Sequence, residues 1–279
     1  MPTFLHIPPP PLSQFIDCFW YVDLLVPYTR EKILPTGTIE LMINFGAPHR
    51  KYNQVESDFE LMTEAWVAGF QTEYIVNEPV AETNMIGVRF KPGGAYPFLG
   101  GVVYELRNAV VDLEAVIGYD AAEMRERLYE QPTAAARFGL LQELLLERLM
   151  ADYDGLEAVQ YAVQTLDQLS GRLSIRELSE QVGMSQKHLI HQFKKMVGVS
   201  PKQCARVLTL QKVLHLIDPA VSVNWSAIAH ECHYYDQAHF NRDFKAFTGL
   251  TPAQYVILRQ EHFGDVQQGE EVHFVPIIG

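Results

Sequence analysis

A near-repeat in the C-terminal half constrains the fold of this 279-residue chain more than any other feature. The first copy runs from Ile175 to Pro201 and the second from Trp225 to Pro252. Each copy has apolar and small residues at helical spacing, a short break, a second helical stretch, and then a glycine followed three residues later by a proline. The offset between the copies is 50 residues before the break and 51 after it. The pattern predicts two helix-turn-helix units, of which the second has a turn longer by one residue.

Capping residues mark where the second helix of each unit begins and ends. Ser185 and Asp236 have side chains that accept hydrogen bonds from backbone amides at a helix N-terminus. Gly198 and Gly249 suit the left-handed backbone that ends many helices. Between the copies, residues 201–217 form an amphipathic stretch that would make a rod of about 25 Å. Such a rod could hold two helices in successive major grooves on one face of DNA, about 34 Å apart.

The turn of the second unit departs from that of the first at one position. Where the first turn has Gly183, the second has His233. In a left-handed backbone a residue other than glycine costs about 1–2 kcal/mol. Histidine tolerates a positive φ better than most residues, so a left-handed turn here would carry strain at the lower end of that range.

Charge is distributed unevenly along the chain. There are 22 Lys and Arg residues against 34 Asp and Glu, a net charge of −12. Residues 171–260 hold 11 basic and 6 acidic residues, whereas residues 1–170 hold 11 and 24, and residues 261–279 hold 0 and 4. A basic module joined to an acidic one favours DNA as the partner of the repeat segment.

The N-terminal part has the alternation and turn signals of β-structure. Residues 39–45 place apolar side chains on one face at a period of two, and residues 66–70 and 85–90 form two further strand-like runs. The turn residues Lys91–Gly94 end the last run. We therefore predict an α+β fold, with an N-terminal β-rich domain resembling a sandwich or barrel. An all-α domain with two helix-turn-helix units on a linker helix follows it.

These patterns divide the chain into four parts. We expect a β-rich domain over residues 1–120 and a helical connector over residues 121–153. The double helix-turn-helix domain is expected over residues 154–260, and an acidic tail over residues 261–279.

The connector carries an apolar stripe at spacings of three and four. A stripe of this kind either packs into the ordinary core or forms a seam between two chains. We hypothesise that residues 1–150 dimerise through it. The residues of the stripe are Phe138, Leu141, Leu145 and Leu149.

The segment from Gly155 to Arg259 resembles the DNA-binding domain of the AraC family of transcription regulators. The resemblance rests on the two motifs in order and on the stretch Asp236–Tyr255, which matches the family signature nearly throughout. The N-terminal half more weakly resembles the β-rich sensing domain of one branch of the family. The residues that carry this weaker likeness are Leu34-Pro35-x-Gly37-x-x-Glu40-Leu41, Trp66-Val67-x-Gly69 and Gly87-Val88-Arg89-Phe90-x-Pro92-Gly93-Gly94.

The resemblance implies a cytoplasmic activator or other regulator of transcription that binds double-stranded DNA and contacts RNA polymerase. It also implies that a small-molecule effector or homodimerisation, acting through the N-terminal domain, could control DNA binding. Two alternatives stay open. One is a small-barrel enzyme that carries a DNA module, and the other is a constitutive DNA-binding protein with a purely structural N-terminal domain.

Family members contact bases through the second helix of each unit. By resemblance, the base-contacting residues are Lys187, Ile190 and His191 in the first unit and Gln237, Ala238, His239 and Arg242 in the second. Arg242 has the donors to bind guanine O6 and N7, Gln237 can pair with adenine, and Ile190 offers only apolar contact. Contacts to phosphate groups, which set register without selecting sequence, are expected from Lys194, Lys195, Arg206 and Lys245. The alternative is a solvated helix face with no partner.

Aromatic residues and one arginine in the β-rich half are candidates for a ligand pocket. They are Trp20, Tyr21, Trp66, Phe70 and Arg89. Arg89 alternates with apolar neighbours and therefore lies on the face opposite to the core stripe of its strand. A sandwich core without any ligand would use the same aromatic residues.

Metal, cofactor and membrane chemistry have little support in the sequence. The three cysteines, Cys18, Cys204 and Cys232, lie far apart, which excludes a disulfide framework and fits reduced thiols in the cytoplasm. The pairs His188-x-x-His191 and His230–His233 have helical spacing but no third or fourth ligand. In the β-rich half, His6 and His49 fall outside the expected strands. We therefore expect neither metal nor cofactor, no catalytic residues, and no secretory or membrane-spanning segment.

Overall fold

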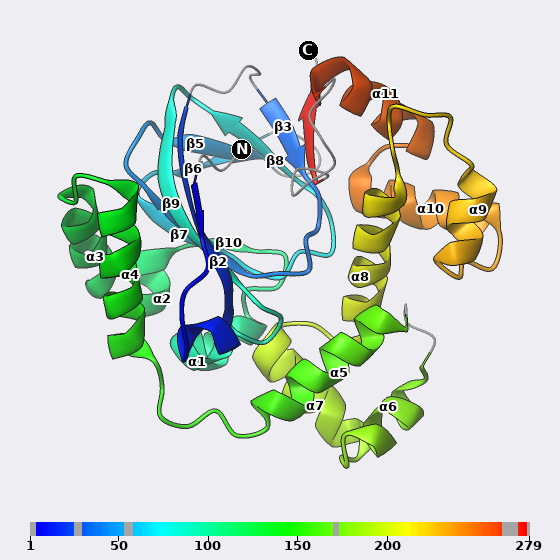
Figure 1. Cartoon of the computed structure of the whole chain (residues 1–279), viewed down its shortest axis with the longest axis horizontal. Helices are drawn as coiled ribbons and strands as arrows, with labels where there is room; N and C mark the ends of the chain where they lie inside the picture. The colour runs from blue at the N-terminus through cyan, green and yellow to red at the C-terminus, as the bar shows by residue number, and fades with distance from the viewer. Residues whose placement is uncertain (1–3, 25–29, 53–57, 170–172, 264–272, 278–279) are drawn as a thin grey trace.

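The computed structural model describes residues 4–24, 30–52, 58–169, 173–263 and 273–277 (Figure 1). Its N-terminal part contains two antiparallel sheets, and its C-terminal part is helical. The first sheet has the strand order β1 (Phe4–His6), β2 (Ile16–Leu24), β9 (Thr83–Phe90), β4 (Glu40–Asn44), β7 (Ala65–Ala68) and β10 (Val110–Asp112). The second has the order β11 (Phe274–Ile277), β3 (Arg30–Ile33), β8 (Ile75–Pro79), β5 (His49–Tyr52) and β6 (Phe59–Met62).

The two faces of the first sheet pack against different layers, as the alternation along β9 shows. Ile86, Val88 and Phe90 belong to the main core, which the first sheet shares with the helices, whereas Met85 and Arg89 face the second sheet. The helical segments of the N-terminal part are η1 (Leu12–Gln14), α1 (Tyr96–Leu99), η2 (Gly100–Tyr104), α2 (Leu113–Ile117), α3 (Asp120–Tyr129) and α4 (Ala134–Arg148). The strands expected near residues 39–45, 66–70 and 85–90 are confirmed as β4, β7 and β9.

The apolar stripe on α4 is part of this core. Phe138, Leu141 and Leu145 are at most 5% exposed, and Leu149 packs against the same cluster. The ring of Phe138 lies 6.2 Å from that of Phe19 on β2. The prediction of a dimer seam at this stripe was wrong, because the single chain already buries the side chains that a seam would need.

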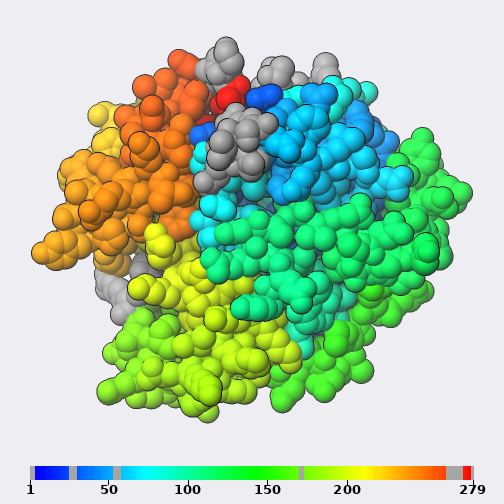
Figure 2. Space-filling model, turned by 180° about the vertical axis from the view of Figure 1, so that it is seen from behind, coloured from blue at the N-terminus to red at the C-terminus, as the bar shows by residue number. Residues whose placement is uncertain are grey.

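Seven helices make up the described C-terminal domain: α5 (Leu156–Gln168), α6 (Ile175–Gln181), α7 (Gln186–Val197), α8 (Pro201–Leu216), α9 (Trp225–Glu231), α10 (Gln237–Thr248) and α11 (Pro252–Phe263). We call α6 with α7 the first unit and α9 with α10 the second unit. The linker helix α8 runs between them, and the two units project at separate places from one side of the molecule (Figures 1 and 2). None of the helices within the described ranges is both long and apolar enough to cross a bilayer.

The expected caps hold both second helices. The Ser185 hydroxyl accepts a hydrogen bond from the His188 amide, and the Asp236 carboxylate accepts one from the His239 amide at 2.6 Å. Gly198, with φ of 90°, ends the second helix of the first unit. The α+β prediction with two helix-turn-helix units is therefore confirmed.

The second turn is left-handed despite its histidine. His233 has φ of 60°, close to the 69° of Gly183 at the same place in the first unit. The two turns therefore share one backbone geometry, and the second unit carries the strain that the first avoids.

The tail contributes a strand that the sequence patterns do not reveal. β11 pairs antiparallel with β3 along four residue pairs, from Phe274 with Ile33 to Ile277 with Arg30. α11 packs against β11, so the last helix of the DNA-binding domain and the second sheet are neighbours (Figure 1). The acidic tail residues at positions 265, 270 and 271 lie outside the described residues.

Candidate nucleic-acid interface and sheet cavity

The second helix of each unit turns one face inward and one face to solvent. Leu189 and Phe193 on α7, and Phe240 and Phe244 on α10, are at most 1% exposed. The expected base-contacting residues lie on the other face. Exposed among them are Lys187, His191, Gln237, Ala238 and Arg242, and half-buried are Ile190 and His239. DNA contact by these residues stays a prediction.

The expected phosphate-contacting residues have different surroundings. Lys194 and Lys245 are exposed, whereas Lys195 Nζ lies 4.9 Å from the centre of the Tyr96 ring. Arg206 on α8 pairs with Asp243 on α10 at 3.0 Å and lies over the ring of Phe247. Arg206 thus joins the linker helix to the second unit, whether or not it also contacts a phosphate. Phosphate contact by these four residues likewise stays a prediction.

A shallow groove runs beside α10. Its lining includes Gln237, Arg242 and Lys245, together with Asn241 and the start of α11 at Pro252. Asn241 is exposed, faces the same side as Arg242, and was absent from the predicted base contacts. Its amide can pair with adenine in the way that Gln237 can.

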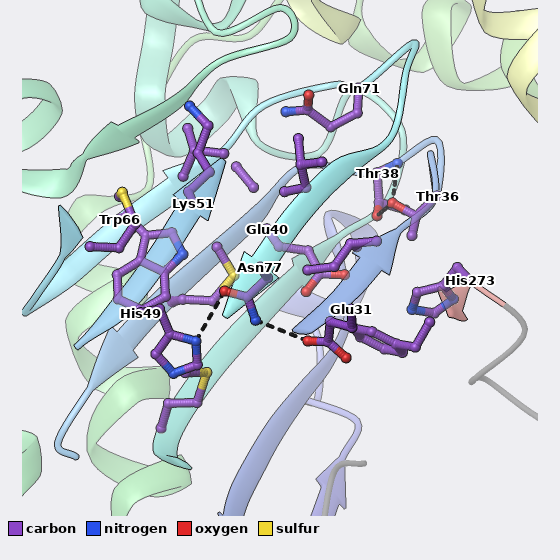
Figure 3. A pocket seen from close by; sticks show the side chains of 18 of the residues that line it. Glu31, Thr36, Thr38, Glu40, His49, Lys51, Trp66, Gln71, Asn77 and His273 are labelled. Carbon is purple, nitrogen blue, oxygen red and sulfur yellow. Dashed lines mark hydrogen bonds between the residues drawn. The ribbon is translucent and has the colours of Figure 1, made fainter. Parts of the chain in front are cut away.

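A cavity lies between the two sheets (Figure 3). The space that the centres of water-sized molecules can occupy is about 190 Å³, enough for a small organic molecule rather than one or two waters. Trp20, Trp66 and Arg89 line it, as the sequence suggested. Tyr21 and Phe70 instead belong to the main core shared with the helices. Ligand binding by the lining residues stays a prediction.

Three neighbouring strands of the first sheet join in a charged cluster on the cavity wall. Arg89 on β9 donates to Glu40 Oε1 on β4 at 2.9 Å, and Trp20 on β2 donates to Glu40 Oε2 at 3.2 Å. Register places these residues side by side, because Glu40 pairs directly with Arg89. The arginine charge is thus balanced within the cavity wall.

A row of polar side chains crosses the second sheet (Figure 3). Asn77 Nδ2 on β8 donates to Glu31 Oε1 on β3 at 2.9 Å, and His49 Nδ1 on β5 lies 3.1 Å from Asn77 Oδ1. Glu31 and His49 are buried, at 6% and 4% exposure. Burial lowers the pKa of His49, which the hydrogen bond with Asn77 offsets only in part. The expectation that His6 and His49 lie outside the strands was wrong. His6 is the last residue of β1, and His49 is the first residue of β5, which is polar and shows no apolar alternation.

The cavity wall also contacts the DNA-binding domain. Leu34, Thr36 and Thr38 line the cavity, and the Pro35 carbonyl in the same turn accepts a hydrogen bond from Gln211 on α8. A Cβ placed on Gly37 would lie 3.6 Å from the side chains of Val207 and Leu208, also on α8. The turn between β3 and β4 therefore separates the cavity from the linker helix.

The cysteines and the histidine pairs are the remaining candidates for chemistry that the sequence offered. No group of three or more His, Cys, Asp or Glu residues within the described ranges is placed to hold a metal ion. The three cysteines are buried, and none of them forms a disulfide. Burial raises the pKa of Cys204 to about 12 and that of Cys232 to about 11, so both thiols stay protonated near neutral pH.

Family models match one segment in each half of the chain. Residues 5–112 match a family described as a domain of unknown function, DUF6597, and residues 178–256 match a helix-turn-helix domain. No curated protein matches the chain.

Several solved structures align with the chain at low identity. ToxT from Vibrio cholerae aligns with 9% identity and a TM-score of 0.46, covering 86% of this chain and 98% of ToxT. ToxT bound to (E)-4-(8-methylnaphthalen-1-yl)but-3-enoic acid gives 10% and 0.47, with coverage of 86% and 98%. The AraC-like transcriptional activator CuxR gives 13% and 0.29, with coverage of 69% and 76%.

The helix-turn-helix match supports the domain that the repeat first indicated. It begins in α6 and ends in α11, so it spans both capped units and the linker helix between them. The matched segment also contains all seven residues expected to contact bases. This chain carries a helix-turn-helix domain of DNA-binding transcription regulators, and its two capped units resemble those of the AraC family.

Proposed function

We propose that a small molecule bound in the cavity between the two sheets controls DNA binding by this regulator. The observation that carries the proposal is the turn Leu34–Thr38, which lines the cavity on one side and packs on the linker helix on the other. A ligand that shifts this turn acts directly on the helix that holds both units.

The linker helix is the element on which spacing depends. Its 16 residues carry the first unit at one end and the second at the other. Two helices that enter successive major grooves must lie about 34 Å apart, so a tilt of α8 against the sheets changes how well both units fit one site. A ligand shifts this equilibrium only by the difference in its affinity for the two arrangements.

Within this function we assign sequence selection to the exposed faces of α7 and α10. Arg242, Gln237 and Asn241 have the side chains best suited to base edges on α10, and Lys187 and His191 face solvent on α7. Contact with RNA polymerase, a cytoplasmic location and homodimerisation are further expectations for a regulator of this family. Dimerisation would need a surface other than the buried stripe on α4.

Cavity filling provides the test. Sites bound by the full chain are first selected from random DNA, and the affinity is then measured with and without 2-naphthol and 1-octanol. Ala68→Phe places a bulky side chain in the cavity wall and should abolish any ligand response while leaving a DNA-binding protein. Ala135→Phe adds the same ring at an exposed position on α4 and should leave the response intact.

A constitutive DNA-binding protein would behave differently. In that case neither compound changes the affinity for DNA, neither raises the melting temperature of the parent chain, and Ala68→Phe binds DNA as the parent does. That combination would favour a purely structural role for the β-rich domain.

A further inference from the structure

The hydrogen-bond directions in the cavity fix which chemical groups a ligand must bring. The row of polar side chains on the second sheet begins at Glu31, whose ionised carboxylate can only accept hydrogen bonds. The Asn77 amide therefore directs its Nδ2 donor toward Glu31. Asn77 Oδ1 is then an acceptor, and His49 Nδ1 must carry the proton between them. Because burial lowers the pKa of His49, its ring is neutral near pH 7 and Nε2 carries a lone pair. His49 therefore offers an acceptor.

That acceptor has no partner. Within the described part of the chain, no group donates to His49 Nε2, although the atom is buried. A buried polar atom without a partner destabilises the fold, and a ligand donor would remove that cost.

Two further lining residues have the same need. Gln71 Nε2 donates to the carbonyls of Gly69 and Ala109, both at 3.0 Å, which fixes Gln71 Oε1 as an acceptor. Neither Gln71 Oε1 nor Thr83 Oγ1 has a hydrogen-bond partner among the described residues. All three unpartnered atoms can accept a hydrogen bond, and only the threonine hydroxyl can also donate one.

The charged lining residues, by contrast, already have partners. Arg89 pairs with Glu40, and Lys51 Nζ pairs with Glu60 at 2.8 Å. A carboxylate ligand would bring a further charge into a largely apolar space and would meet acceptors instead of donors. The apolar part of the lining consists mainly of tryptophan, methionine and branched aliphatic side chains: Trp20, Trp66, Met42, Met62, Met85, Val22, Ile33, Ile75 and Val110.

We propose that the cavity binds an uncharged, largely apolar molecule that carries a hydroxyl or N–H donor, and that it discriminates against carboxylates. The inference rests on the proposed function, since it names the ligand class of the same cavity. Binding is expected to place the donor against His49 or Thr83 and the apolar body against the tryptophans and methionines.

Matched ligands test the class on the full chain by calorimetry. The pairs are 2-naphthol with 2-naphthoate and 1-octanol with octanoate. Each alcohol should bind at least about tenfold more tightly than its carboxylate, and 2-naphthol about threefold to tenfold more tightly than naphthalene. A carboxylate that binds more tightly than its alcohol overturns the ligand class but leaves the cavity as an effector site. Failure of all five compounds to bind removes both the ligand class and the proposed function.

Two variants locate the donor. Thr83→Val keeps the shape of the side chain and His49→Phe keeps a ring, and both remove an acceptor. At least one should lower the affinity for 2-naphthol to that for naphthalene. The control is Thr165→Val, because Thr165 is also buried but its hydroxyl bonds to Tyr161 on α5, away from the cavity. If both cavity variants bind 2-naphthol as the parent does, these acceptors do not hold the ligand.

A second inference concerns β11, which has one face toward the cavity and one toward the DNA-binding domain. Phe274 lines the cavity together with His273, which precedes the strand (Figure 3). Val275, the next residue along, is fully buried in the main core, which also contains Tyr255 of α11. Arg259 on α11 is 5% exposed, and its Nη1 lies 3.5 Å from the Phe274 carbonyl.

We infer that a ligand in the cavity stabilises the pairing of β11 with β3. A ligand in contact with Phe274 would hold β11 in place, and because α11 packs against β11 it would also hold α11. This also rests on the proposed function, and it adds a second contact between cavity and DNA-binding domain beside the turn Leu34–Thr38. The strand lies at the edge of its sheet and pairs only with β3 among the described strands, so it can detach without breaking the sheet.

Amide hydrogen exchange on the full chain tests this stabilisation. 2-Naphthol should slow exchange in β11 and α11 by about tenfold and leave α3 unchanged. Phe274→Ala should weaken 2-naphthol binding. Val275→Ala should preserve binding but reduce the effect of the ligand on DNA affinity. Ligand binding that leaves β11 exchange unchanged and is insensitive to Phe274→Ala would overturn this stabilisation while leaving the effector cavity in place.

Discussion

The two helix-turn-helix units have the same local structure but pack against different parts of the N-terminal domain. The helix α7 ends at Gly198, where an added Cβ would lie 3.0 Å from the Val103 carbonyl in η2, on the helical layer. The helix α10 ends at Gly249, where an added Cβ would lie 2.6 Å from Tyr74 and 2.9 Å from Lys32. Tyr74 directly precedes β8 and Lys32 is in β3, so the second unit rests on the sheet that forms the cavity.

The two units therefore differ less in their own structure than in the part of the N-terminal domain that each one contacts. Both units have a capped second helix and a left-handed turn, and both end at a left-handed glycine. Among the described residues, the second unit abuts strands whose neighbouring residues, Glu31, Ile33 and Ile75, line the cavity, whereas the first unit abuts η2. We therefore expect a ligand to affect the second unit more than the first.

The largest expected effect comes from removing the close approach at the second unit. Gly249→Ala should destabilise the chain by about 1–3 kcal/mol beyond Gly183→Ala, because the new methyl group overlaps the Tyr74 ring. Gly183 is the matched control: it has the same φ of 69°, but no atom lies within 4 Å of an added Cβ. Both variants share the left-handed strain of about 1–2 kcal/mol. Urea unfolding measures both. Equal losses would show that the second unit does not rest on the sheet in solution.

The units should also be separable on DNA. Arg242→Ala should lower affinity by about 1–3 kcal/mol and relax base preference in one half of the site, and Lys187→Ala should do the same in the other half. Lys194→Ala should weaken binding to all sequences alike and reduce the salt dependence. Quantitative binding to the selected sites and to single-base variants gives the answer. The exposed control is Glu143→Ala on α4, which should bind as the parent does. Unchanged binding by Arg242→Ala at every site would remove α10 from the major groove.

Lowering the pH should destabilise the contact between β11 and α11, next to the second unit, before it affects the first unit. Burial, with the nearby charges of Arg89, His215 and Arg259, lowers the pKa of His273 to about 3. In the unfolded chain this histidine binds a proton near pH 6.5, whereas in the folded chain it stays neutral down to about pH 3. The free energy of unfolding is therefore unaffected above pH 6.5 and falls as the pH drops from 6.5 toward 3. The loss is about 1.4 kcal/mol per pH unit.

Unfolding at pH 7 and pH 5.5 measures this slope. His273→Gln should reduce it, although part should remain because burial also lowers the pKa of His49. Hydrogen exchange at pH 5.5 should increase more in α11, which follows the second unit and packs against β11, than in α7 of the first unit. Faster exchange in α7 first would reverse the comparison between the units.

The smallest effect is expected at the second turn. His233→Gly should leave stability unchanged or raise it slightly, because relief of strain is offset by about 0.4–1 kcal/mol of unfolded-state entropy. His233→Val should melt clearly lower than the parent, since a branched side chain resists a φ of 60°. Thermal melting compares the three proteins. If His233→Val melts with the parent, the turn is not left-handed in solution and the two units differ in geometry.

Local patterns predicted most of the helical half and much of the first sheet. The caps at Ser185 and Asp236 are visible because they depend on neighbours a few residues away. The strand β9 is visible because one of its faces is buried against helices and is uniformly apolar. The sequence revealed the apolar face of α4 but not the surface that covers it, because a core and a dimer interface require the same residues.

The second sheet and the cavity could not be predicted in the same way. The strands Arg30–Ile33 and His49–Tyr52 contain mostly polar residues, because one face lines the cavity and the other meets solvent or the DNA-binding domain. β11 is a four-residue strand with a proline, and it exists only through pairing with a strand near the other end of the chain. Such pairings depend on tertiary contacts, which period and propensity do not encode.

Pairing between β3 and β11 has a consequence for how the chain is made. A ribosome makes β3 before the helical domain and β11 after it, so the second sheet keeps an open edge throughout synthesis of the helical domain. Open edges invite pairing with other chains. A product cut short before residue 273 would carry both helix-turn-helix units and an unfinished β-rich domain. Residues 274–277 therefore complete a sheet whose partner strand, at residues 30–33, is synthesised before the whole helical domain.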